Sequence, residues 1–99
     1  MDRPFVVKAD PLLLPLIPKY LANRRQDLTR LADAVAQRDL KALRKLGHDM
    51  SGSGGAYGLP PVSDIGKRIE DAALAGDMTV ITAAIEDLRA FLDTVELSS

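Results

Sequence analysis

The sequence predicts an all-α fold, an antiparallel up-down-up-down four-helix bundle with a short N-terminal helical turn. Alanine and leucine, which both favour helices, make up 28 of the 99 residues. Apolar residues recur every three or four positions in four successive segments, and no segment alternates with period two for long enough to predict a strand. The linkers are short, so neighbouring helices should be antiparallel. We expect one domain over residues 1–99, with a core of about residues 10–97.

The N-terminal part of the chain predicts a helical turn followed by a long helix. Asp10 and Pro11 are typical of an N-cap and the first helical position, which predicts a turn near residues 11–15. Further prolines interrupt a continuous helix there. The main helix should follow over about residues 16–36. Its apolar stripe, in which Arg24 is irregular, is Ile17, Leu21, Leu28, Leu31 and Val35.

The second segment begins clearly and ends ambiguously. Asp39 is a suitable N-cap, and the stripe that follows is Leu40, Leu43, Leu46 or Gly47, and Met50. Glycines then stand at positions 52, 54 and 55, and each costs about 1 kcal/mol relative to alanine inside a helix. Periodicity alone therefore favours a loop from about Gly52. The alternative is a continuing helix that needs bare backbone there. Tyr57 is interpreted as a packing residue near the helix end.

The last two segments have the most regular patterns. Pro60 and Pro61 suit a helix start, and the third stripe is Val62, Ile65, Ile69, and Ala72 or Ala73. Gly76 is a C-terminal stop and Asp77 the next N-cap. The fourth stripe is Met78, Ile81, Ile85, Leu88, Leu92 and Val95. We interpret all four stripes as core packing.

Composition excludes several classes of function. The net charge is −1, without the basic excess of a nucleic-acid binder. The chain has no cysteine and one histidine, which excludes disulfides, cysteine nucleophiles and multi-histidine metal sites. The longest apolar stretch, residues 11–18, contains prolines and is too short for a membrane span, and the first eight residues do not resemble a signal peptide. We expect a cytoplasmic monomer without metal, cofactor, membrane or nucleic acid.

His48 is the only histidine, and helical geometry places it away from the core. At 100° per residue it lies about 140° from Leu43, whereas the apolar stripe is centred about 5° from Leu43. We therefore expect the imidazole to face solvent. If the helix continues through the glycines, the same side holds three cations and two glycines, namely Lys41, Arg44, Lys45, Gly52 and Gly55.

An exposed neutral imidazole is a good nucleophile. Nearby cations favour the addition of a phosphoryl group, which carries about two negative charges. Asp49 and Asp71 are candidates to orient the ring, but spacing selects neither. The alternative is an incidental surface histidine beside solvated charges. A solvated face is our interpretation of Arg24, Arg25 and Arg30.

The run from His48 to Gly58 resembles the histidine-containing phosphotransfer (HPt) domain family. That family has a histidine, a lysine and a glycine three and four residues later, and another glycine ten residues after the histidine. Gly52 and Gly58 match the glycines, whereas Ser51 stands at the lysine position. The resemblance covers about residues 10–97. It includes third-helix residues Ile65, Ile69, Glu70, Ala72 and Ala73, and first-helix residues Tyr20, Leu21 and Leu28.

The resemblance implies a phosphocarrier in a two-component phosphorelay rather than a stand-alone enzyme. His48 would receive a phosphoryl group from the aspartate of one receiver domain and pass it to another. The receiver would supply Mg²⁺ and the catalytic side chains, and Gly52 would give it access to the ring. Because Ser51 replaces the family's lysine, the site lacks one positive charge. Lys41, Lys45, Lys67 or Arg68 would replace that charge.

The candidate partner- or phosphoryl-binding residues are Lys41, Arg44, Lys45, Ser51, Gly52 and Gly55. Two alternatives stay open at this point. One is a helical docking module that regulates a receiver or a histidine kinase by binding alone. The other is a helical domain unrelated to signalling.

Overall fold

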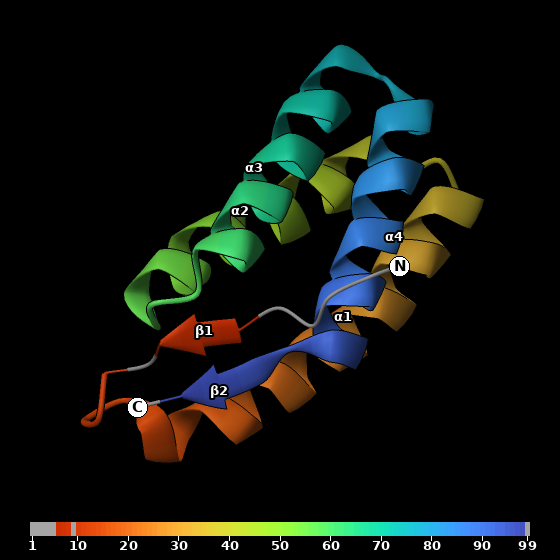
Figure 1. Cartoon of the computed structure of the whole chain (residues 1–99). Coiled ribbons are helices and arrows are strands. Elements are labelled where there is room, and N and C mark those ends of the chain that lie inside the picture. Colours follow the sequence, from red (N-terminus) through yellow and green to blue (C-terminus); the bar gives the residue numbers. More distant parts are fainter. Residues whose placement is uncertain (1–5, 9, 99) are drawn as a thin grey trace.

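Four antiparallel helices form the molecule, as the sequence predicts. The computed structural model describes residues 6–8 and 10–98. The helices are α1 (Ile17–Ala36), α2 (Leu40–Ala56), α3 (Pro60–Ala75) and α4 (Met78–Thr94). They run along one long axis (Figure 1). The predicted N-terminal turn is also present, although its regular part is a 3₁₀ helix, η1, at Leu14–Leu16, slightly later than expected.

The helix ends use the predicted capping residues. The Asp39 carboxylate accepts a hydrogen bond from the Ala42 backbone N–H, and Asp77 does the same for Val80, both at 3.1 Å. Gly76 ends α3 with a φ of 72°, a left-handed conformation that favours glycine. These two capping hydrogen bonds and the left-handed glycine determine where α2 and α4 begin and where α3 ends.

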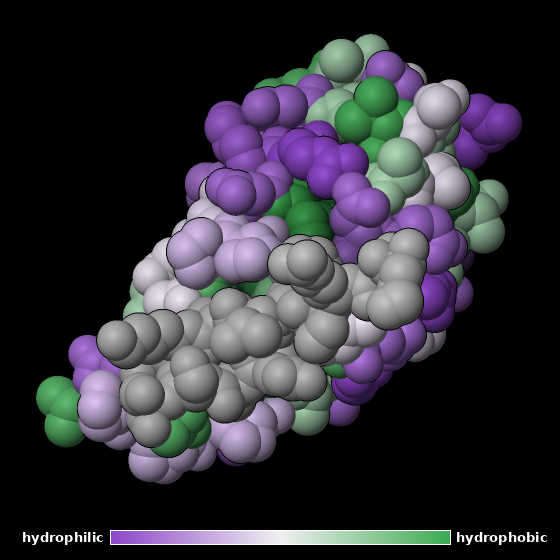
Figure 2. Space-filling view, in the orientation of Figure 1, coloured by the Kyte–Doolittle hydropathy of each residue, from purple (hydrophilic) through white to green (hydrophobic). Residues whose placement is uncertain are grey.

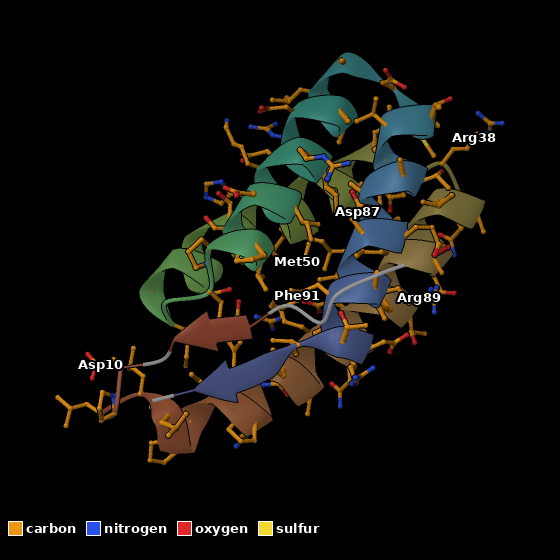
Figure 3. All side chains as sticks on the ribbon, viewed as in Figure 1. Asp10, Arg38, Met50, Asp87, Arg89 and Phe91 are labelled. Atoms are coloured by element: carbon orange, nitrogen blue, oxygen red, sulfur yellow. The ribbon has the colours of Figure 1, made fainter. Side chains whose placement is uncertain are left out.

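Each helix packs against two neighbours in a ring, α1–α2–α3–α4 and back to α1. Met50 and Phe91 lie in the interior between the helices (Figure 3) and are almost fully buried. The outer face over α3 is mostly hydrophilic, with apolar residues near the α3–α4 turn (Figure 2). Predicted stripe residues that are only partly buried are Leu21, Leu28, Val35, Leu46, Met78 and Val95. Leu40 was expected in the core but is 37% exposed.

The helix α2 continues through the glycines, so the predicted loop from about Gly52 is wrong. The reason is the close approach of α2 to α3. A Cβ on Gly54 would lie 2.5 Å from the Ser63 backbone nitrogen, and one on Gly47 would lie 2.6 Å from that of Glu70. On α3, a Cβ on Gly66 would lie 2.5 Å from the Ser51 backbone nitrogen. Tight packing of the two backbones therefore outweighs the poor helix propensity of glycine.

Two short strands depart from the all-helical expectation. Strand β1 (Val6–Lys8) pairs in parallel with β2 (Glu96–Ser98), and Val7 lies opposite Leu97. They lie side by side at the end of the bundle where α1 begins (Figure 1). Each strand has three residues, too few for a period-two pattern to be recognised. Their pairing also joins the two ends of the sequence, which local patterns do not reveal.

A polar cluster around the buried carboxylate of Asp27 joins α1 to α2, and the sequence did not reveal it. Asp27 is 4% exposed and forms 2.8 Å ion pairs with Arg24 and Arg30. Arg24 also donates to the Ser53 hydroxyl of α2 at 3.2 Å, and Tyr20 shares a 2.7 Å hydrogen bond with that hydroxyl. The solvated-face interpretation is therefore wrong for Arg24, whose side chain is 17% exposed. Tyr57 stacks on Tyr20, which agrees with its predicted packing role.

Candidate functional site

His48 projects from the outer face of α2, and its side chain is 72% exposed. Its Nδ1 atom lies 3.0 Å from Oε2 of Glu70, which reaches across from α3. An ionised carboxylate only accepts hydrogen bonds, so Nδ1 carries the proton and donates it to Glu70. The other ring nitrogen, Nε2, then holds a free lone pair. Glu70 is 16% exposed and is therefore much less free to move than the ring it orients.

Glu70 takes the orienting role that the sequence left between Asp49 and Asp71. Each of those aspartates pairs instead with a lysine on its own helix, Asp49 with Lys45 at 3.1 Å and Asp71 with Lys67 at 3.0 Å. Glu70 was recognised only as part of the third-helix resemblance. Its partnership with His48 depends on the α2–α3 register, in which its backbone lies against Gly47.

A shallow hollow of about 320 Å³ lies beside the imidazole. It is lined by Lys41, Arg44, Lys45, His48 and Glu70. A helical side chain leans toward the N-terminus of its helix, so the ring of His48 lies over the turn that carries Arg44 and Lys45. The structure thus brings the three predicted cations together with His48. The hollow is open to solvent, and it combines a nucleophilic nitrogen with positive charge.

The other three predicted site residues lie outside the lining of this hollow. Ser51 is half-buried, and its carbonyl accepts a 2.6 Å hydrogen bond from the Ser63 hydroxyl of α3. Gly52 is exposed, and outside its own stretch of helix no described atom lies within 4 Å of where its Cβ would be. For Gly55 the nearest such atom is the Ser63 hydroxyl oxygen at 4.0 Å. A side chain at position 52 would lean toward the turn of His48, so Gly52 leaves that side of the ring open.

Within residues 6–8 and 10–98, no group of three or more histidine, cysteine or acidic residues is placed to hold a metal ion. No helix in this part of the chain is long and apolar enough to cross a membrane.

The chain was compared with known proteins. No curated protein and no solved structure matches it. The family model of the Hpt domain matches residues 16–97. These residues contain all four helices, together with His48 and Glu70. Because the match covers most of the chain, the protein belongs to the Hpt domain family and has that family's phosphotransfer role in two-component signalling.

Proposed function

We propose that His48 relays a phosphoryl group from the phospho-aspartate of one receiver domain to the aspartate of another. The main support is the imidazole geometry, with Nδ1 held by Glu70 and Nε2 free. The Nε2 lone pair forms the new bond to phosphorus while the bond from phosphorus to the aspartyl oxygen breaks. The aspartate leaves as a carboxylate. The ring then carries a positive charge, which faces the Glu70 carboxylate.

Most of the catalytic machinery in this relay belongs to the receiver. The receiver domain supplies Mg²⁺ and its own catalytic side chains, and the present chain supplies a positioned nucleophile. Lys41, Arg44 and Lys45 face the incoming phosphoryl group, while Ser51, Gly52 and Gly55 contact the docked receiver. The chain acts as one domain over residues 1–99, as a monomer in the cytoplasm. It is a phosphocarrier that needs no cofactor of its own.

Changes at Glu70 should slow phosphorylation without unfolding the protein. Glu70→Ala removes the acceptor for the Nδ1 proton, so the imidazole shifts toward the tautomer protonated on Nε2. We expect the rate of phosphorylation by phosphoramidate to fall about tenfold, equivalent to about 1.4 kcal/mol of transition-state stabilisation. Glu70→Gln keeps an acceptor oxygen and should lose less. Nitrogen-15 chemical shifts of His48 report the tautomer, and an unchanged tautomer in Glu70→Ala would contradict the positioning role.

The receiver partner is tested by comparing a large donor with a small one. Gly52→Gln should stabilise the protein by a few tenths to about 1 kcal/mol, because glutamine is a better helix former and the position is open. Its side chain should slow transfer from a phosphorylated receiver domain about tenfold, while phosphoramidate still reaches the ring. Ala83→Gln on α4 is the matched control, since Ala83 is exposed on a helix that does not contact α2.

Two results would oppose this function. Unchanged receiver transfer in Gly52→Gln would show that the receiver does not approach over this turn. Receiver binding without any phosphohistidine in the wild-type protein would instead select the docking module, the alternative that Ser51 supports.

A further inference from the structure

We propose that Arg44, together with Lys41, binds the phosphoryl group once it is attached to His48. This inference rests on the proposed function, because it concerns the phosphorylated state of that histidine. It assigns the positive charge of the site to the turns that precede His48 in α2. It also distinguishes among the cations that surround the ring.

The direction of the ring is the first argument. Glu70 holds Nδ1 on the α3 side, and Nε2 lies on the opposite edge of the imidazole. The side chain leans toward the N-terminus of α2, where Arg44 lies one turn and Lys41 two turns before His48. Both cations line the hollow beside the ring. A group attached to Nε2 therefore enters a space that these two side chains border.

The pattern of ion pairs is the second argument. Lys45 is bound to Asp49, and Lys67 is bound to Asp71. The hydrogen bond from Lys67 to Asp71 raises the pKa of that lysine, so Lys67 is already committed to a carboxylate. Among residues 10–95, none of the salt bridges or side-chain hydrogen bonds involves Arg44 or Lys41. The one carboxylate that lines the hollow, Glu70, is held by His48.

The chemistry of the two free cations is the third argument. A phosphoryl group brings about two negative charges and three acceptor oxygens. The planar guanidinium of Arg44 can donate two parallel hydrogen bonds to such oxygens, whereas an ammonium acts as a point charge. Arg44 and Lys41 can meet the group without breaking an ion pair, but Lys45 and Lys67 cannot. Ser51 is neutral and adds no charge. Arg44 is therefore the principal ligand and Lys41 the second.

The experiment follows phosphohistidine by phosphorus-31 NMR after phosphorylation with phosphoramidate. A cation beside the group favours its dianion, so the titration midpoint of the phosphoryl group should rise by about 0.7 pH unit in Arg44→Gln. That shift is about fivefold in the equilibrium constant, as expected for one charge at about 4 Å in water. The midpoint should rise less in Lys41→Gln. In Arg44→Lys, which keeps a positive charge, the midpoint should lie between those of the wild type and Arg44→Gln. Lys19→Gln, which removes one exposed charge of α1, is the matched control and should leave the midpoint unchanged.

The outcomes separate the two proposals. An unchanged midpoint in Arg44→Gln, or an equal rise in Lys19→Gln, overturns the assignment of Arg44 while phosphorylation of His48 stands. A wild-type protein that acquires no phosphohistidine overturns the proposed function itself. Arg44 is exposed and makes no ion pair within residues 10–95, so Arg44→Gln is expected to unfold at the wild-type temperature.

Discussion

A His48→Gln protein is expected to fold normally and to accept no phosphoryl group from either phosphoramidate or a phosphorylated receiver domain. The chain has one histidine, so the substitution removes the only imidazole nucleophile. The fold should persist because the side chain is 72% exposed and, among residues 10–95, forms one hydrogen bond, to Glu70. The loss in stability should be below about 1 kcal/mol. Intact-mass spectrometry before and after acid treatment measures the labile phosphoryl group, and thermal unfolding checks the fold.

The control for this experiment is Lys19→Gln, which changes an exposed residue of α1 without touching the nucleophile. It should be labelled like the wild-type protein. Acid-labile labelling of His48→Gln at the wild-type rate would show that the acceptor lies elsewhere and would contradict the assignment of His48.

Two glycines of α2, two residues apart, are expected to respond to alanine in opposite directions. In Gly54→Ala the new Cβ would lie 2.5 Å from the Ser63 backbone nitrogen, so α2 and α3 must separate. Overpacking of this kind costs about 1–3 kcal/mol, and the strained contact with backbone should exceed the gain in helix propensity. We expect a net loss of about 2 kcal/mol. In Gly52→Ala no described atom outside the local helix lies within 4 Å of the new Cβ, and the protein should gain up to about 1 kcal/mol.

Thermal or urea unfolding measures both effects. For a domain of this size, 1 kcal/mol corresponds to about 4–8 °C in Tm, so the two variants should be well separated. Equal stabilisation of both would mean that Gly54 does not serve close packing against α3. Equal destabilisation would mean that Gly52 has a structural role instead of leaving space beside His48.

The bundle could be predicted because its signals are local. Asp39, Gly76 and Asp77 mark helix ends through hydrogen bonds and backbone conformations that span a few residues. The glycine-rich end of α2 was mispredicted for the opposite reason. Helix propensity includes only the cost of each glycine within one helix. The stabilising contact that offsets this cost is made with α3, and Gly54 lies beside α3 only in the folded protein.

The site was predicted in part for the same physical reason. The exposure of His48 and its shared face with Lys41, Arg44 and Lys45 follow from rotation along a single helix. Glu70 belongs to another helix, and its distance to Nδ1 depends on the register between α2 and α3. The close contact of Gly47 with the Glu70 backbone sets that register. One helix alone could not provide this information.

The buried Asp27 shows a further limit of pattern reading. A charged residue in a helix is normally taken as exposed, because burying a charge without a partner is costly. Here Arg24 and Arg30 supply the partners, and Arg24 in turn reaches Ser53 on α2. In the stripe of α1 the irregular Arg24 is the one sign of this arrangement, since Asp27 and Arg30 fall outside the stripe.

The central claim is that Nε2 of His48 is the phosphoryl acceptor because Glu70 holds Nδ1. The most direct test is a long-range proton–nitrogen correlation spectrum of the nitrogen-15-labelled protein after phosphorylation with phosphoramidate. Coupling to phosphorus identifies the modified nitrogen. We expect one phosphohistidine, at position 48, with the phosphoryl group on Nε2 and the proton on Nδ1. A phosphoryl group on Nδ1, or a folded protein that acquires none, would contradict it.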